Sequence, residues 1–357
     1  MANLRVILDS VVTPSLNGIS RYAEELTRQL IATAPRGSTV SGIVPASPEP
    51  DYERLAQVLP GLRDLSKSPL ARRQLAAAWQ HGFTLLPGTG IVHAPTLLAP
   101  LHNHGPAGQT VVTIHDAIAW THPEIISSRE TSWHRAMAKR AERYADAVVV
   151  PTHAVAEELG DFVDFGDRLR VIGGAASLVG PTAHDLELPD RFLLTTIGAT
   201  SASGLEPLLA AMDLPALRGW ELHVVAPAGT IIPAGERIRP WIDPEADIER
   251  ELFQRATVFV LASDAEGFGL PLLDAMASGT PVVHSDVPAL IEVAGDAGLI
   301  VERSPADGYP DRLAEAIAGV LGDPLLADQL VVAGTDRSRA FSWRDSAEKV
   351  WQLHADL

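Results

Sequence analysis

The chain has 357 residues, of which 46% are apolar and 20% charged, so it is long enough to form two globular domains with sizeable cores. It contains no cysteine, which excludes disulfides, thiolate catalysis and cysteine-ligated zinc. The formal net charge of -17 argues against a nucleic acid partner, because an acidic protein repels phosphates.

Apolar segments alternate with amphipathic ones from residue 1 to about residue 174. The first run, 4–12, is apolar and β-branched and predicts a buried strand, and 19–34 has apolar residues at helical spacing. The other strands that we expect here are 38–44, 90–95, 109–116, 145–152 and 169–174, and the other helices are 51–80, 128–144 and 154–160.

The alternation stops at 177–190, a segment without periodicity that predicts a linker, and then resumes. The strands that we expect after it are 191–199, 221–227, 257–263, 280–286 and 298–302. The helices that we expect are 205–212, 248–256, 271–279, 289–295, 311–323, 324–341 and 342–357.

Strands alternating with helices are typical of a parallel sheet covered on both faces. We therefore predict the α/β class, with two tandem Rossmann-like doubly wound domains, 1–180 and 181–341, facing a central cleft. The last helix, about 342–357, is expected to pack back on the first domain. Ligands in such folds bind beyond the carboxyl ends of the strands.

The charge is uneven along the chain. Residues 1–180 hold 16 Lys and Arg against 17 Asp and Glu, whereas 181–357 hold 12 against 28. Two basic clusters lie in the first half: Arg63, Lys67, Arg72 and Arg73, and then Arg129, Arg135, Lys139, Arg140 and Arg143. Each is either a solvated face or a surface for an anionic membrane or an anionic acceptor.

No apolar run reaches the roughly 18 residues of a membrane span, and 1–12 lacks the features of a signal peptide. These observations predict a cytoplasmic protein, with peripheral contact at the inner face of the membrane left open by the basic clusters.

Several ligand motifs are missing. No G-x-G-x-x-G follows a strand and there is no P-loop, which argues against a nicotinamide dehydrogenase and a P-loop enzyme. The sequence has no G-x-S-x-G elbow and no Asp-x-Asp pair to hold a metal on a sugar diphosphate. The pair His102 and His104 has no carboxylate nearby in sequence and predicts a polar loop.

The stretch 263–286, SDAEGFGLPLLDAMASGTPVVHSD, carries two carboxylates around a predicted helix start. Glu266 lies in the loop, Pro271 suits the first helical turn, and Asp274 falls one turn further on. Free N–H groups at a helix start favour phosphate, and carboxylates accept hydrogen bonds from hydroxyls. The array therefore fits a nucleotide sugar, although a carboxylate that merely complements the helix dipole fits the local pattern equally well.

Residues 266–283 resemble the signature of the retaining family-four glycosyltransferases, which have the two-domain GT-B fold. The family pattern is a glutamate, seven residues and a second glutamate, written EGFGLPxxEAMAxGxPVV. Further similar segments occur in family order at 17–26, 91–95, 111–124, 249–263 and 291–299. The resemblance covers nearly the whole chain.

This resemblance implies a role for each matching position. As catalytic residues, Glu266 would hold hydroxyls of the donor sugar and His115 would lie beside the transferred sugar. The donor-binding positions implied are Gly18, Phe268, Gly269, Leu270 and Asp274, with Asp274 on the ribose. The implied reaction moves a hexose of mannose or glucose type from a nucleotide-diphosphate sugar to a saccharide or lipid-linked acceptor, with retention. No metal or other cofactor is expected.

Two departures from the family pattern keep alternatives open. The second acid is Asp274 rather than glutamate, and the positions of the usual Arg and Lys near the diphosphate are Ser203 and Gly204. Arg237 or Arg239 could replace those cations. Without them, the chain could be a degenerate GT-B protein that binds a nucleotide or a partner without catalysis. A GT-B epimerase or phosphorylase is a third option, although 181–348 has no lysine for pyridoxal phosphate.

Overall fold

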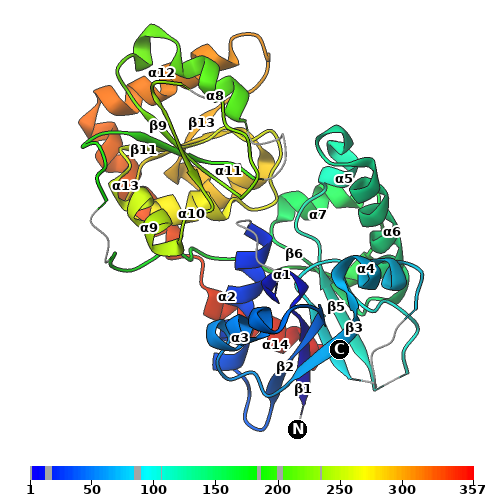
Figure 1. Ribbon diagram of the computed structural model, residues 1–357. Coiled ribbons are helices and arrows are strands. Elements are labelled where there is room, and N and C mark those ends of the chain that lie inside the picture. Colours follow the sequence, from blue (N-terminus) through cyan, green and yellow to red (C-terminus); the bar gives the residue numbers. More distant parts are fainter. Residues whose placement is uncertain are drawn as a thin grey trace. The chain divides into compact units, whose positions relative to one another are not determined.

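A computed structural model describes residues 2–12, 18–83, 90–105, 107–182, 186–198, 204–233 and 235–357. The chain forms two compact units, one comprising Met1–Gly174 with Ser342–Leu357 and the other Ala175–Phe341. Each unit is an α/β sandwich with a parallel sheet between helices (Figure 1).

The first unit contains a seven-stranded parallel sheet in the order β3-β2-β1-β4-β5-β6-β7. Its strands are β1 (Asn3–Ile7), β2 (Thr39–Ala46), β3 (Leu65–Ala71), β4 (Ile91–Ala94), β5 (Gln109–Thr113), β6 (Ala147–Val150) and β7 (Leu169–Val171). The order of the strands reverses between β1 and β4, which opens a crevice at the carboxyl edge there.

The helices of the first unit are α1 (Asp9–Val12), α2 (Gly18–Ala32), α3 (Glu49–Val58), α4 (Arg72–Gln80), α5 (Ile118–Thr121), α6 (Ser128–Tyr144), α7 (His153–Gly160) and α14 (Trp343–Asp356). Helices α4 and α6 bury Trp79 and Met137 against β4, β5 and β6 in one continuous core. Helices α2 and α14 pack against each other (Figure 1), and the Trp351 indole Nε1–H donates to the Leu30 carbonyl at 3.1 Å.

The second unit contains a six-stranded parallel sheet in the order β10-β9-β8-β11-β12-β13. Its strands are β8 (Leu193–Thr196), β9 (Leu222–Ala226), β10 (Ile238–Ile242), β11 (Val258–Leu261), β12 (Val282–Ser285) and β13 (Leu299–Val301). The order reverses between β8 and β11, so the end of β11 lies at the point where such sheets bind ligands.

The helices of the second unit are α8 (Leu205–Met212), α9 (Ala246–Arg255), α10 (Leu270–Ala277), α11 (Pro288–Ala294), α12 (Tyr309–Gly322) and α13 (Pro324–Ser338). Helices α8 and α12 pack together and share a buried core with β8, β9 and β11. Helices α10 and α13 pack on each other as a second pair.

Three details of the expected fold are wrong. The region 51–80 is not helical throughout but contains β3 between α3 and α4, and strand β10 was not expected at all. Both are edge strands that carry a proline and remain largely exposed, so neither has the apolar run that marks a buried strand. The expected strand 4–12 ends at Ile7, and its last residues form α1.

The boundary between the units lies at Gly174–Ala175 rather than after residue 180. The segment expected to be a linker is bound to the second unit. The amides of Ser177 and Leu178 donate to Asp274, and the Leu186 amide donates to Glu251. Sequence without periodicity therefore acquires a fixed place through its backbone hydrogen bonds.

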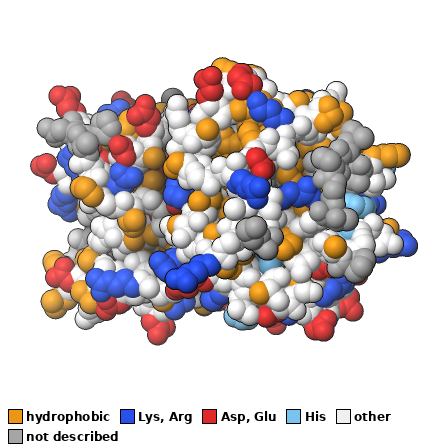
Figure 2. Space-filling model, turned by 90° about the horizontal axis from the view of Figure 1, so that it is seen from below, with side chains coloured by type: hydrophobic (Ala, Val, Ile, Leu, Met, Phe, Trp, Pro, Cys, Tyr) orange, Lys and Arg blue, Asp and Glu red, His pale blue; other side chains and the backbone are white. Residues whose placement is uncertain are grey.

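Among the described residues, no single helix is long and apolar enough to cross a membrane, although one bent pair, Tyr309–Gly322 with Pro324–Asp356, has the length and composition to do so. On the face shown in Figure 2, basic side chains lie among acidic and uncharged ones and do not form one continuous basic surface.

Two buried histidines join α14 to the first sheet. The side chain of His93 is fully buried and that of His354 nearly so, with ring centroids 5.5 Å apart. The Nε2 atom of His354 lies 3.4 Å from Nδ1 of His93, and the Nδ1–H of His354 donates to Gln109 Oε1 at 3.3 Å. Burial lowers the pKa of His354 to about 4 and that of His93 well below its ordinary value.

Acid should therefore destabilise the first unit before most carboxylates titrate. The folded state keeps His354 neutral, whereas the unfolded chain binds a proton near pH 6.5, so stability is full above that pH and falls as the pH drops toward 4. Protonation of His354 alone should cost roughly 2 kcal/mol at pH 5. Thermal melts from pH 8 to pH 5 measure this loss. The matched variant His354→Gln, which cannot titrate, should show a flatter profile, and an identical profile would contradict the assignment.

Candidate functional site

The loop between β11 and α10 occupies the carboxyl edge of the second sheet. Strand β11 is fully buried, and α10 begins at Leu270, one residue before the predicted start, so that Pro271 lies in its first turn. Gly269 precedes the helix with φ of 82°, and a Cβ there would lie 2.5 Å from Leu290 Cδ2. Glycine adopts this positive φ without the strain that a Cβ would cause, and any larger residue would also have to displace the Leu290 methyl group.

The carboxylate of Glu266 lies half-buried in this loop, and its direction is set by its neighbours. Its Oε1 accepts a hydrogen bond of 2.9 Å from Ser263 Oγ. Ser263 is itself fixed, because Ser285 at the end of β12 donates to its carbonyl at 2.6 Å. Glu266 is therefore held by the ends of two adjacent strands while part of its surface stays accessible.

The side chains of Phe268 and Leu270 point into the unit. Both are buried, and the ring of Phe268 meets the edge of Phe341 with centroids 5.7 Å apart. These side chains are therefore not available to a ligand, which leaves the first N–H groups of the helix, groups that have no intrahelical acceptor. Their contact with a donor stays a prediction.

Asp274 has a structural role that the sequence did not reveal. Its side chain is fully buried, and Oδ1 accepts hydrogen bonds from the amides of Ser177 at 2.6 Å and Leu178 at 2.9 Å. The carboxylate thus holds the segment at which the chain enters the second unit. The expected contact with ribose stays a prediction.

His115 lies in the first unit, just beyond the end of β5. Its Nε2 lies 2.7 Å from the Pro95 carbonyl, and Tyr22 packs edge-on against its ring at 4.8 Å. A carbonyl only accepts, so Nε2 carries the hydrogen and Nδ1 is left as an acceptor in the neutral ring. Burial lowers the pKa of His115, which favours that neutral form.

His115 also lines a cavity of about 920 Å³ that belongs to the first unit. Gly18 begins α2 and is exposed, and the next two residues, Ile19 and Ser20, line the same cavity. The predicted residues thus fall into two groups. Glu266, Phe268, Gly269, Leu270 and Asp274 share one sheet edge of the second unit, and His115 and Gly18 share one sheet edge of the first.

Comparison with known proteins covers both groups. Residues 16–176 match the model of the family described as Glycosyltransferase Family 4, and residues 191–323 match the model described as Glycosyl transferases group 1. The chain belongs to the family-four glycosyltransferases.

Among curated relatives, an O-antigen chain mannosyltransferase B from Escherichia coli is 33% identical over 157 residues, which is 42% of this chain and 39% of the relative. A D-inositol 3-phosphate glycosyltransferase from Corynebacterium aurimucosum is 31% identical over 225 residues, 62% of this chain and 47% of the relative. The matches thus span less than half the length of these relatives.

Among solved structures, a sucrose-phosphate synthase from Thermosynechococcus elongatus superposes with a TM-score of 0.75 at 21% identity, over 100% of this chain and 99% of the other. Anabaena HepE in complex with UDP and glucose superposes with a TM-score of 0.73 at 15% identity, over 100% of each chain. These likenesses support the GT-B fold.

The loop before α8 departs from the family-four pattern of basic residues. Gly204 has φ of 64°, and a Cβ there would lie 1.8 Å from the Ala262 carbonyl oxygen. A charged side chain at this position would require the backbone to move. Ser203, the other aligned position, lies outside the described residues.

The suggestion that Arg237 or Arg239 supplies the missing cation is wrong. Arg237 precedes β10 and donates to the Met212 and Leu217 carbonyls, and Arg239 pairs with Glu221. Because β10 and β9 run parallel, both arginines lie at the amino ends of the strands, at the opposite edge from Gly269. They stabilise that edge of the sheet and do not approach the motif loop.

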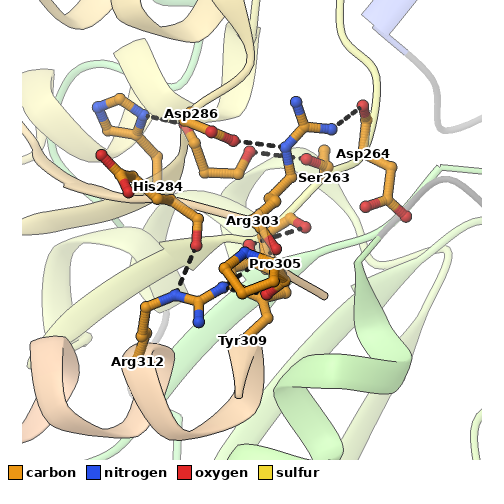
Figure 3. A network of polar contacts seen from close by, with 11 residues as sticks. Ser263, Asp264, His284, Asp286, Arg303, Pro305, Tyr309 and Arg312 are labelled. Carbon is orange, nitrogen blue, oxygen red and sulfur yellow. Dashed lines mark hydrogen bonds and ion pairs between the residues drawn. The ribbon is translucent and has the colours of Figure 1, made fainter. Parts of the chain in front are cut away.

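A cation that the sequence analysis missed does lie at the carboxyl edge. Arg303 follows β13, donates from Nε to Asp286 Oδ1 at 2.6 Å, and donates from Nη1 to the Asp264 carbonyl at 2.6 Å (Figure 3). Arg312 of α12 in turn donates to the carbonyls of Arg303 and Pro305 (Figure 3). The one available signal was its position, a charge directly after a strand.

This network ties together the loops that follow β11, β12 and β13, and the loop after β11 carries Glu266. It therefore positions the motif acid. Among the described residues, no group of three His, Asp and Glu side chains is placed to hold a metal ion.

Replacing Asp274 should separate its structural role from ligand binding. Asp274→Ala leaves the buried amide of Leu178 and the half-buried amide of Ser177 without an acceptor, at a cost of roughly 1–3 kcal/mol for the buried one, whereas Asp274→Asn keeps an acceptor oxygen and most of the stability. Chemical denaturation of both variants measures the difference. Equal stability of Asp274→Ala and wild type would refute the structural role. If Asp274 also binds ribose, Asp274→Asn should weaken nucleoside diphosphate binding while the protein stays folded.

Proposed function

We propose that the chain transfers a hexose from a nucleotide-diphosphate sugar to a saccharide or lipid-linked acceptor, with retention of anomeric configuration. The observation that carries the proposal is the arrangement of Glu266 and Gly269 at the start of α10, at the carboxyl edge beside the β8–β11 reversal. Carboxylate and free amides side by side suit a ligand with both hydroxyls and phosphates.

In this proposal each group has one task. Glu266 accepts hydrogen bonds from donor-sugar hydroxyls, and the amides at the start of α10 bind the diphosphate. The bond from the anomeric carbon to the diphosphate breaks as the bond to the acceptor oxygen forms on the same face. The acceptor proton passes to the leaving phosphate oxygen, so no protein nucleophile is needed. The N-terminus of helix α10, without a metal, stabilises the leaving group.

Two relatives support a hexose and a uridine nucleotide. One relative is named a mannosyltransferase, and HepE has been solved with UDP-glucose. We propose donors of this type, and a cytoplasmic location where such donors are made. Peripheral contact with an anionic membrane fits less well with Arg135 and Arg140, because both donate to backbone carbonyls in the first unit.

A second candidate is a degenerate member that binds a nucleotide or partner without catalysis. Two observations favour it. The position that suits a family lysine is a glycine that cannot carry a side chain in this conformation, and Asp274 is already engaged by two amides. Two charge-assisted bonds to a diphosphate would be worth roughly 1.5–3 kcal/mol each, enough to separate an active enzyme from an inactive one.

The role of Glu266 is tested by substitution once a donor is found by thermal shift with the common nucleotide sugars. Glu266→Ala should lower kcat/KM about 10- to 150-fold, the loss of roughly 1.5–3 kcal/mol of hydrogen bonding to a charged group. The matched control is Glu315→Gln, an exposed acid on α12. Full activity in Glu266→Ala would overturn the assignment.

Calorimetric titration with nucleoside diphosphates separates the enzyme from the degenerate protein. Micromolar binding by the wild type supports the enzyme, because the helix and existing groups then suffice for the diphosphate. The variant Ser203→Arg restores one family cation without disturbing Gly204. Binding by that variant alone, with none by the wild type at millimolar ligand, would make the natural chain a degenerate member.

A further inference from the structure

The cavity of about 920 Å³ in the first unit is lined by arginines from two distant parts of the sequence. Arg72 and Arg73 begin α4, and Arg129 lies in the first turn of α6. The sequence showed these residues as parts of two separate basic clusters. The fold brings one end of each cluster to a single cavity, which His115 also lines.

Helices α4 and α6 lie side by side (Figure 1), and two contacts show that they run in the same direction. The Trp133 indole Nε1–H donates to the Ala76 carbonyl at 3.5 Å, and further along both helices a Cβ at Gly82 would lie 2.8 Å from Arg140 Nη2. In both contacts the α6 residue lies about the same number of positions after its partner from α4, as expected for helices that run in the same direction. Both helices therefore begin at the same end of the cavity, which brings their arginines together.

Among the described residues, two of the three arginines that line this cavity have no ionic partner. Arg72 pairs with the buried Asp9 at 2.9 Å, whereas Arg73 and Arg129 are exposed and have no partner among the residues that the structure describes.

The two lining carboxylates are already engaged. Glu130 accepts from the amide and hydroxyl of Ser127 in the capping box of α6, and Asp116 accepts from the Ile118 amide. Two guanidinium groups thus remain for a ligand.

The other walls suit a polyhydroxy ring. Trp120 and Trp133 are half-buried at the cavity and offer flat apolar surface, on which sugar rings can pack. His115 adds Nδ1 as an acceptor because Nε2 is engaged by Pro95. Hydroxyl recognition and anion recognition are therefore combined in one cavity.

We propose that this cavity binds an acceptor that carries a phosphate on a polyhydroxy ring, that is, a sugar or polyol phosphate, either free or as the headgroup of a lipid. Arg73 and Arg129 bind the phosphate, and the ring lies against the tryptophans with a hydroxyl toward His115. A phosphate of charge about -1.5 to -2 matches two unpaired guanidinium groups better than a single carboxylate does. The inference rests on the proposed sugar transfer and specifies its acceptor.

Binding of glucose 6-phosphate, glucose and inorganic phosphate to the full chain tests the proposal by calorimetry. Glucose 6-phosphate should bind at least about tenfold more tightly than glucose, as expected for charge-assisted hydrogen bonds. The double variant Arg73→Gln, Arg129→Gln should abolish this preference. Arg36→Gln, an exposed arginine outside the cavity with no described partner, is the matched control and should keep it. Equal binding of the two sugars, or a preference that survives in the double variant, would overturn the proposal.

Vesicles distinguish the two sources of the phosphate. Binding to vesicles containing phosphatidylinositol, but not to neutral vesicles, identifies a lipid headgroup if the double variant loses it. Binding of the soluble sugar phosphate alone identifies a free acceptor, and binding of neither overturns the proposal. Nucleotide-sugar binding separates the proposed acceptor from the proposed sugar transfer.

If the wild type and the double variant both bind a nucleotide sugar, but the wild type shows no preference for the sugar phosphate, only the acceptor assignment fails. If the preference is present but no nucleotide sugar binds, the proposed transfer fails instead.

Discussion

The carboxylate of Asp274 connects the motif helix α10 to the segment at which the chain enters the second unit. It is fully buried, and a buried carboxylate is stable only when its oxygens accept hydrogen bonds. The amides of Ser177 and Leu178 meet that need. If the chain at 175–178 moved away from α10, the buried carboxylate would lose these hydrogen bonds. The position of the unit boundary and the anchoring of α10 follow from this one group.

The carboxyl edge of the second sheet is organised before any ligand binds. Arg303 links the ends of β12 and β11, Ser285 holds the Ser263 carbonyl, and Ser263 orients Glu266. A carboxylate held in this way needs little reorganisation when charge and hydroxyl positions change during a reaction. The same edge has two glycines with positive φ, Gly204 and Gly269, and at Gly204 the Ala262 carbonyl also leaves no room for a side chain.

The first unit combines the packing of helix α14 with a polar cavity at the start of α4 and α6. Helix α14 is held by Trp351, which donates to the Leu30 carbonyl of α2, and by the neutral pair of His354 and His93, which lies in β4. The parallel helices α4 and α6 begin at the cavity that His115, just beyond β5, also lines. A parallel sheet explains this arrangement, because a helix that follows a parallel strand begins near the carboxyl end of that strand.

The sequence by itself determined the α/β class, most buried strands and the motif loop. Buried strands such as β5 and β11 are continuous apolar runs, and the glycines and Pro271 of the motif depend on local backbone geometry. The family pattern at 266–283 then sufficed to place Glu266 before a helix start.

Only the tertiary structure decided four features. They are the edge strands β3 and β10, the amides bound by Asp274, the role of Arg303, and the position of Arg73 and Arg129 on one cavity. Edge strands bury too little to show an apolar pattern, so their pairing with a neighbour defines them. The other contacts join residues far apart in the chain, and their partners are backbone amides and carbonyls that every residue carries. Side-chain chemistry along a sequence cannot specify such partners, because the folded path of the backbone selects them.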